Sequence, residues 1–176
     1  SAEITSFYFR PVDEQPILEF EPGQYIGIKL NIDGQEVRRN YSLSALAKVG
    51  RYRISVKREP GGVVSNYLHD RLQVGDIVEL FPPAGEFTLA ASEKPLVLIS
   101  GGVGITPMMA MIDRLVAAAP SRPVQFVHAC RNAEVFAFGA HLAKVAERHP
   151  QVKLHLFHDE GPVAAPVQSG RVDLRA

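Results

Sequence analysis

A glycine-rich segment between an apolar run and a helical pattern constrains the fold of this chain most. The run Pro95–Ser100 is continuously apolar, which is typical of a strand buried on both faces of a sheet. The segment Ser100–Pro107 follows it and has glycine at three positions, and a helix is predicted from Pro107 to Ala119. Strand, glycine turn and helix in this order predict a parallel α/β unit, with Thr106 at the N-cap of the helix.

The rest of the second half repeats this pattern. Strands are predicted at Val124–Ala129 and Val152–His158, with a helix between them that Asn132 should cap. This alternation favours a parallel sheet with right-handed crossovers. Since three strands are few for a nucleotide-binding sheet, we expect the domain at 93–176 to be C-terminally incomplete, with a further helix starting near Asp173. The apolar stripe of the capped helix is Val135, Phe138, Leu142 and Val145.

The first half has the alternating pattern of antiparallel strands. The candidate strands are Ile4–Arg10, Gln24–Leu30, Glu36–Ser44, Arg51–Lys57 and Asp76–Phe81. Turn residues separate them, and Asp33-Gly34 indicates a hairpin. A short helix is expected at Ser65–Arg71, with Ser65 as its N-cap. We predict a six-stranded antiparallel β-barrel over residues 1–92, joined to the α/β domain near Ala90–Lys94.

The composition argues against several classes of protein. Lysine plus arginine and aspartate plus glutamate both total 19, and a net charge of zero gives no sign of nucleic acid binding. The single cysteine, Cys130, cannot form an intrachain disulfide or hold an iron–sulfur cluster, and it fits a reducing, cytoplasmic setting. No apolar stretch approaches the roughly 20 residues of a membrane span. His155 and His158 should face opposite sides of a strand, so we predict no metal site.

Three segments carry residue types that can hold phosphate groups. Arg39, on a predicted strand, can pair with a phosphate, and Tyr41 on the same strand face offers a ring for stacking. Residues 57–68 turn on glycines into a helix, as residues 101–107 do, and backbone N–H groups at such turns favour anions. Each segment also has a simpler explanation: solvated arginines beside a core tyrosine, a Pro-Gly-Gly loop, and a turn that only needs glycine. Pro107 replaces the third glycine of the G-x-G-x-x-G fingerprint.

Taken together and in order, these segments resemble a known family. Four motifs resemble the ferredoxin-NADP reductase superfamily: Pro22–Tyr25, Arg39–Ser42, Gly62–Ser65 and Gly101–Pro107. The longer runs Val56–His69 and Val127–Asn132 are similar to the reductase half of the flavohaemoglobin family of nitric oxide dioxygenases. The resemblance covers essentially the whole chain. It implies an FAD-binding barrel followed by an NAD(P)-binding domain.

The resemblance also implies residue roles. Arg39 would bind the FAD pyrophosphate, and Tyr41 would stack on the isoalloxazine. Ser42 would hydrogen-bond near its reactive nitrogen, and Asn40 stands where the family commonly has glutamine. Tyr41, Ser42 and Thr106 are the implied catalytic residues, with Thr106 near the nicotinamide. The other implied contacts are Tyr25, Lys57 and Glu59 along the flavin, Gly62, Val64 and Ser65 at its phosphates, and Gly102, Val103, Gly104, Ile105, Thr106 and Pro107 at NAD(P)H.

The implied reaction is hydride transfer from NAD(P)H to FAD, followed by single-electron transfer to an acceptor. In the family the acceptor is the haem of a globin domain in cis, which supports conversion of nitric oxide to nitrate. No globin-length region occurs in this sequence, and its start inside a predicted strand suggests part of a longer protein. The resemblance favours NADH, although Arg131 could accommodate the 2′-phosphate of NADPH. The family's Cys-Gly-Pro motif and C-terminal aromatic would lie past Ala176, so slow flavin reduction is expected.

Two other functions fit the same residues. The chain could be the reductase component of an oxygenase or a free NAD(P)H:flavin reductase, and the sequence upstream in the gene would separate these from flavohaemoglobin. It could also be a nucleotide-binding module without turnover, which an absorption spectrum would distinguish from a flavoprotein.

Overall fold

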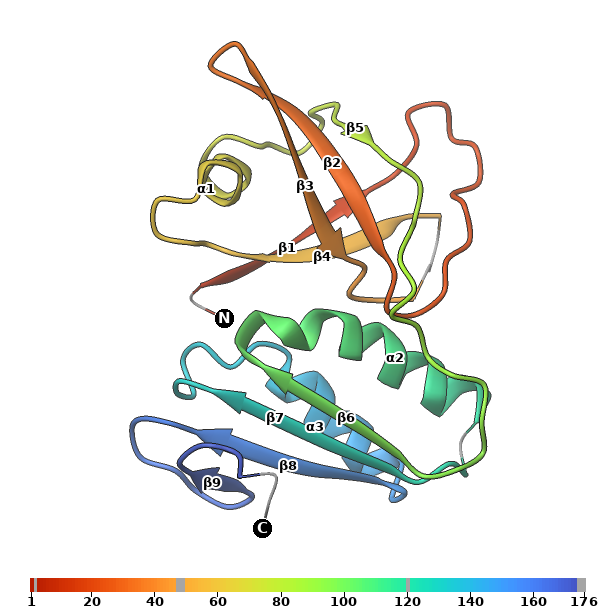
Figure 1. Cartoon of the computed structure of the whole chain (residues 1–176), viewed down its shortest axis with the longest axis vertical. Coiled ribbons are helices and arrows are strands. Elements are labelled where there is room, and N and C mark those ends of the chain that lie inside the picture. Colours follow the sequence, from red (N-terminus) through yellow and green to blue (C-terminus); the bar gives the residue numbers. More distant parts are fainter. Residues whose placement is uncertain (2, 47–49, 120, 174–176) are drawn as a thin grey trace.

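The computed structural model describes residues 1, 3–46, 50–119 and 121–173. It has two parts of different architecture stacked along the long axis of the molecule (Figure 1). The first half of the chain forms antiparallel β-sheets, and the second half forms a parallel sheet with helices. The predicted fold class is therefore confirmed. The start of the helix predicted near Asp173 involves residues 174–176, which lie outside the described residues.

The barrel is built from two antiparallel sheets. One pairs β1 with β4, the other has the order β3-β2-β5, and a bridge between Leu43 and Ile54 connects them. The described residues contain five strands here rather than the predicted six, and β5 has only two residues, so it is shorter than the predicted strand Asp76–Phe81. The strands are β1 (Ile4–Phe9), β2 (Tyr25–Ile32), β3 (Gln35–Ser42), β4 (Tyr52–Lys57) and β5 (Glu79–Leu80).

The hairpin β2–β3 follows from its turn residues. Asp33 and Gly34 both have positive φ, 51° and 83°, as a two-residue hairpin turn requires. Alternation then sends one set of side chains into the barrel, where Ile26 and Ile28 are fully buried. Arg38 and Arg39 of β3 are both exposed, and as adjacent strand residues they point to opposite faces of the sheet.

Helix α1 (Val63–Asp70) begins two residues earlier than predicted, so Ser65 is not its N-cap. Gly62 holds that position, because the turn at Gly61, with φ of 72°, brings the chain into helical geometry sooner. Ser65 lies in the first turn instead. Its hydroxyl donates to the carbonyl of Gly62 (3.3 Å) and accepts from the N–H of Glu59 (3.2 Å).

The second part is a parallel sheet of order β6-β7-β8-β9. Three of its strands agree with prediction, but β9 was missed because three residues without an apolar pattern give no strand signal. One helical turn, η1 (Gly102–Gly104), connects β6 to α2. The strands are β6 (Leu96–Gly101), β7 (Val124–Cys130), β8 (Val152–His158) and β9 (Val167–Ser169), and the helices are α2 (Ile105–Ala118) and α3 (Gly139–Arg148).

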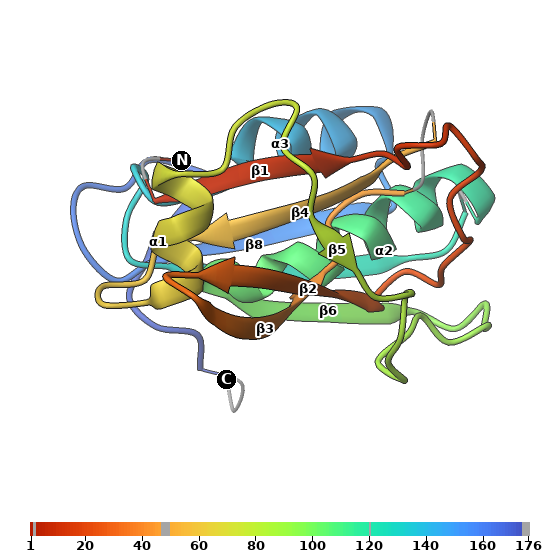
Figure 2. The ribbon, with the colours of Figure 1, turned by 90° about the horizontal axis from the view of Figure 1, so that it is seen from above.

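Both helices cover the same face of this sheet, and α2 lies between the sheet and the barrel (Figures 1 and 2). Phe126 and Leu142 are fully buried in the core that they share. The prediction that the strand at Pro95–Ser100 is buried on both faces is wrong. Val97 and Ile99 point to the opposite face, where they remain 55% and 43% exposed in the described structure.

Two more predicted N-caps are wrong. Helix α2 starts at Ile105 after Gly104, so Thr106 is already inside the helix. Helix α3 starts only at Gly139, and the Asn132 side chain accepts from the N–H of Val135 (3.3 Å) in a turn well before it. Val135 and Phe138 therefore precede the helix that they were expected to join.

The described residues lack two kinds of feature. Neither α2 nor any other helix among them combines the length and apolar character needed to cross a membrane. Nor does that part of the chain bring three or more His, Cys, Asp or Glu side chains together in an arrangement suited to a metal ion.

Candidate functional site

A cleft of about 510 Å³ lies where the barrel meets the α/β part. Three elements build it: the end of β3, the passage from β4 into α1, and the turn from β6 into α2. All three phosphate-type segments of the sequence therefore meet in one place. The lining residues are Arg39, Asn40, Tyr41, Ser42, Ser55, Val56, Lys57, Glu59, Gly62, Val63, Val64, Ser65, Val103, Gly104, Thr106 and Pro107.

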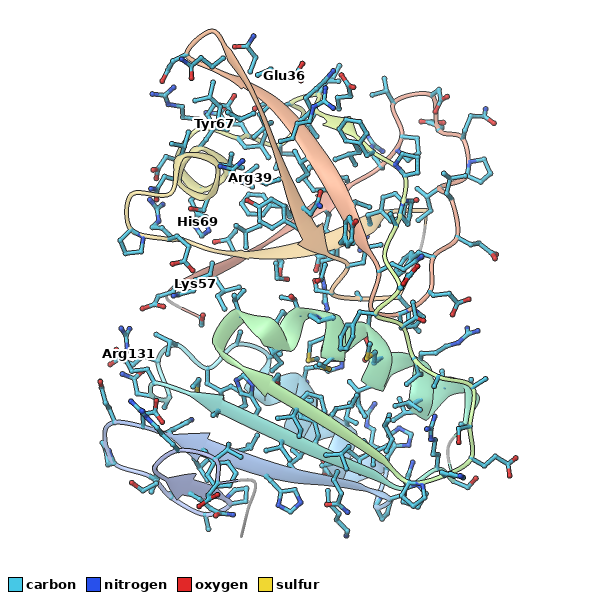
Figure 3. All side chains as sticks on the ribbon, in the orientation of Figure 1. Glu36, Arg39, Lys57, Tyr67, His69 and Arg131 are labelled. Atoms are coloured by element: carbon cyan, nitrogen blue, oxygen red, sulfur yellow. The ribbon has the colours of Figure 1, made fainter. Side chains whose placement is uncertain are left out.

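The β3 wall separates the two adjacent arginines. Arg38 pairs with Glu36 (Nη2 to Oε1, 2.6 Å) and lies over the ring of Phe81 at 5.0 Å, away from the cleft. Arg39 lines the cleft, and no carboxylate among the described residues forms an ion pair with it. Tyr41 is half-buried beside it, and burial raises the pKa of its phenol while Arg39 opposes that shift. The Arg39 guanidinium, whose Nη1 donates among the described residues only to the carbonyl of Arg38 (2.7 Å), thus shares one wall with the Tyr41 ring. Figure 3 shows where Arg39 lies, next to α1.

The β4–α1 wall combines a paired lysine with a glycine turn. Lys57 Nζ lies 3.3 Å from Glu59 Oε1, so its charge is partly satisfied. A Cβ at Gly62 would lie 2.4 Å from Ser65 Oγ, so the packing of the turn itself requires glycine there. Val64 is only 3% exposed and belongs to the barrel core, which anchors α1 at the cleft.

The glycine turn on the third wall contains a glycine that the fold does not need. Gly102 has φ of 50°, a conformation that favours glycine. Gly104 has φ of −61°, and no atom lies within 4 Å of the position a Cβ would take. The explanation that the turn simply needs glycine therefore fails at Gly104. Open space beside a helix start is instead the arrangement that lets a ligand approach the backbone.

Three predicted site residues do not line the cleft. Ile105 is fully buried in the core of the α/β part, so its side chain does not line the cleft. Gly102 forms the turn, and Tyr25 pairs with Ser42 across the β2–β3 ladder while its ring packs on Gly85. Thr106 lines the cleft although it is only 6% exposed.

Sequence reasoning missed Ser55. It lines the cleft, and its hydroxyl lies 2.8 Å from that of Ser6 and 2.9 Å from that of Ser44. Strand alternation could have found it, because Arg53, Ser55 and Lys57 share one face of β4. The cleft thus offers unpaired positive charge, hydroxyls, a phenol ring and two helix starts, a combination that suits a ligand with phosphates and a flat ring system.

Comparison with known proteins agrees with this geometry. Residues 1–89 match the family described as oxidoreductase FAD-binding domain, and residues 98–175 match the one described as oxidoreductase NAD-binding domain. The chain is 65% identical to a flavohemoprotein of Pseudomonas putida over 153 residues, which cover 87% of this chain and 38% of that protein. It is 59% identical to a flavohemoprotein of Pseudomonas aeruginosa over 157 residues, 89% of this chain and 39% of that protein. The chain thus spans well under half the length of these relatives.

Solved structures give the same result. The flavohem-like FAD/NAD binding domain of nitric oxide dioxygenase from Vibrio cholerae superposes with a TM-score of 0.93 at 38% identity, covering 99% of this chain and 75% of that one. The flavohemoglobin of Malassezia yamatoensis with bound FAD and heme gives 0.86 at 25% identity, covering 98% and 45%. Phthalate dioxygenase reductase gives 0.76 at 33% identity, covering 92% and 49%.

Proposed function

This chain belongs to the oxidoreductases in which an FAD-binding domain precedes a NAD-binding domain, as in the reductase part of flavohaemoproteins, and we propose that its cleft holds FAD for reduction by NADH. The resemblance expected from the sequence is thereby confirmed, together with FAD and NAD(P)H as the cofactors. When bound, FAD accepts a hydride and releases electrons one at a time. The observation that carries the proposal is the meeting of Arg39, Tyr41 and the Gly104 turn in one cleft.

Each wall then has a role in binding. Arg39 and the α1 start, with Gly62, Val64 and Ser65, would hold the FAD phosphates through charge and backbone N–H groups. Tyr41 would lie against the isoalloxazine, and Ser42 would hydrogen-bond near its reactive nitrogen. Val103, Gly104 and Thr106 on the facing wall would orient the nicotinamide and exclude water from it.

NADH is the donor that the charges favour over NADPH. Arg131 is the cation that could meet a 2′-phosphate, but it forms an ion pair with Glu3 of the barrel. Asp159 and Glu160 lie beside it, since their N–H groups bond to the carbonyls of Cys130 (3.1 Å) and Arg131 (2.8 Å). The ion pair with Glu3, together with the negative charge of these two neighbouring acidic residues, disfavours a phosphate dianion at Arg131. The buried free thiol of Cys130 agrees with a cytoplasmic location.

The proposed acceptor is the haem of a globin domain, by analogy with the flavohemoglobin structure, and nitric oxide dioxygenation is the activity we propose for the whole protein. With FAD and NADH present, the chain should reduce a ferric globin under anaerobic conditions, and the haem spectrum reports the rate. An oxygenase reductase, the alternative that the phthalate dioxygenase reductase likeness favours, would instead prefer an iron–sulfur acceptor. Faster reduction of a [2Fe–2S] ferredoxin than of the globin would overturn the haem assignment.

Gly104→Ala should separate ligand binding from folding. The backbone at Gly104 accepts alanine and has open space, so the free energy of unfolding should stay constant or rise by up to about 1 kcal/mol. A methyl group in the path of the nicotinamide should weaken NAD⁺ binding to the FAD-loaded protein about 5- to 150-fold, which calorimetry measures.

The matched control is Gly34→Ala at the β2–β3 hairpin. Gly34 also has open space, but its φ of 83° should make alanine cost about 1–2 kcal/mol of stability. NAD⁺ affinity should not change in this variant. If Gly104→Ala binds NAD⁺ like the unmodified chain, the glycine turn is not part of the nicotinamide site.

A further inference from the structure

The segment between β7 and α3, residues 131–138, touches the barrel at two points. At its start, the Arg131 guanidinium pairs with the Glu3 carboxylate. At its end, the Arg53 guanidinium of β4 lies 5.3 Å from the centre of the Phe138 ring. Figure 3 shows Arg131 at the corner of the lower part nearest to the barrel, below Lys57 of the cleft. The segment therefore spans the two parts beside the proposed cofactor site.

The Phe138 end of the segment is held in an unusual conformation. Phe138 has φ of 64°, in the left-handed region that side chains other than glycine rarely adopt, and no side chain caps α3 there. Phe136 anchors the segment by stacking on His128 (5.2 Å between ring centres) and meeting His158 edge-on (5.9 Å). Gly139 makes room for it, because a Cβ there would lie 2.9 Å from the Phe136 ring. A strained backbone that presents one ring to the other domain points to a function for that ring.

Arg53 is fixed equally well on the barrel side. Its Nε donates to Ser44 Oγ at 3.1 Å and its Nη2 donates to the Ser44 carbonyl. No carboxylate pairs with it within the described parts of the chain, so the Phe138 ring is its partner across the domains. Arg53 shares its strand face with Ser55 and Lys57, which line the cleft.

We propose that Phe138 and Arg53 are positioning residues, whose contact fixes the separation of the two walls of the cleft. The kinetic consequence rests on the proposed function, since hydride transfer needs the nicotinamide held about 3–3.5 Å from the flavin. The isoalloxazine would be held by the barrel and the nicotinamide by the α/β part. A small change in the orientation of the two parts would therefore alter the distance between these rings. FAD itself is held mostly by the barrel and should bind independently of this contact.

The test is a double-mutant cycle with Phe138→Leu and Arg53→Met. Each single variant should slow flavin reduction by NADH in stopped flow by about 2- to 30-fold, the range that a cation–π contact supports. The double variant should be no slower than the slower single variant, because both remove one contact. FAD affinity should stay within about twofold throughout, and Phe138→Trp, which keeps a ring face, should retain the unmodified rate.

The matched control is Tyr67→Leu, which removes the contact of Arg71 with Tyr67 (5.9 Å) inside the barrel. Hydrogen–deuterium exchange should become faster in both β4 and residues 131–138 in Phe138→Leu, and only around α1 in Tyr67→Leu. The exchange measurement needs no turnover, so it tests the contact even if NADH fails to reduce the flavin. Additive effects in the cycle, or unchanged exchange at β4 in Phe138→Leu, would overturn the inference.

Discussion

Arg39→Ala should raise the dissociation constant for FAD about 10- to 150-fold while leaving the fold intact. A charge-assisted hydrogen bond to phosphate contributes about 1.5–3 kcal/mol. Arg39 forms no ion pair with a carboxylate in the described structure, so it does not have to break one to bind the phosphate. The side chain lies on the surface of β3 and supports no core packing. Titration of the flavin-free chain with FAD, followed by flavin fluorescence, measures the change.

Arg38→Ala is the control on the adjacent residue. Arg38 points away from the cleft, and its ion pair with Glu36 joins side chains that are 58% and 52% exposed. Such a pair contributes little to stability, so FAD affinity should change by no more than about twofold. Equal effects of the two substitutions would mean that β3 does not present Arg39 to the phosphates.

Acidification should destabilise the NAD-binding part through His128. Burial lowers the pKa of this imidazole to about 4, and the neighbouring His158 contributes to the same shift. The unfolded chain binds a proton near pH 6.5, so between about pH 6.5 and 4 it holds more protons than the folded chain. The contribution of the neutral imidazole to the free energy of unfolding is therefore complete above pH 6.5 and decreases as the pH falls. The total loss is about 3 kcal/mol once His128 is protonated in both the folded and the unfolded chain.

His128→Asn should remove this part of the pH dependence. Asparagine does not titrate, and its amide can replace Nδ1 as the partner of Ser100 Oγ, which lies 2.9 Å away. The pKa values of Glu36 and Asp70 are lowered mainly by hydrogen bonds from Arg38 and Arg58, so protonation of these carboxylates in acid also destabilises the folded chain. This contribution is the same in the unmodified chain and in His128→Asn. Denaturant unfolding at several pH values measures the difference in slope.

His141→Asn is the control for the acid effect. His141 is 45% exposed in an ion pair with Asp113 on the surface of α2 and α3. Its replacement leaves the buried imidazole of His128 in place, so the loss of stability below pH 6.5 that comes from His128 should persist in this variant. If His128→Asn keeps the full slope, the buried imidazole is not the group that titrates.

Local periodicity was sufficient to predict the fold class, whereas element boundaries depended on backbone conformation. Alternating and continuous apolar runs placed most strands correctly, because each strand face buries its own residues. The N-caps at Ser65, Thr106 and Asn132 were wrong because positive φ at Gly61 and Phe138, and the turn at η1, decide where each helix begins. The residue types that favour helix N-caps do not determine these backbone φ angles.

The site was predictable as a set of segments but not residue by residue. Alternation correctly separated Arg39 from Arg38, and the order of the motifs brought three walls together. The Ile105 side chain faces the core instead of the cleft, because family spacing does not say which residue of a first helical turn is buried. Ser55 could have been found from the alternation along β4. The contact of Phe138 with Arg53 depends on how the two domains meet, and no local pattern in the sequence encodes that.

The central claim is that the cleft holds FAD where NADH can reduce it. Anaerobic titration of the FAD-loaded chain with NADH, followed to equilibrium at each addition, tests it most directly. The flavin absorbance should bleach in proportion to the NADH added and reach its end point at about one NADH per bound FAD, because one hydride carries both electrons. A chain that binds FAD stoichiometrically but keeps its oxidised spectrum at excess NADH, or one that fails to bind FAD, would contradict the account.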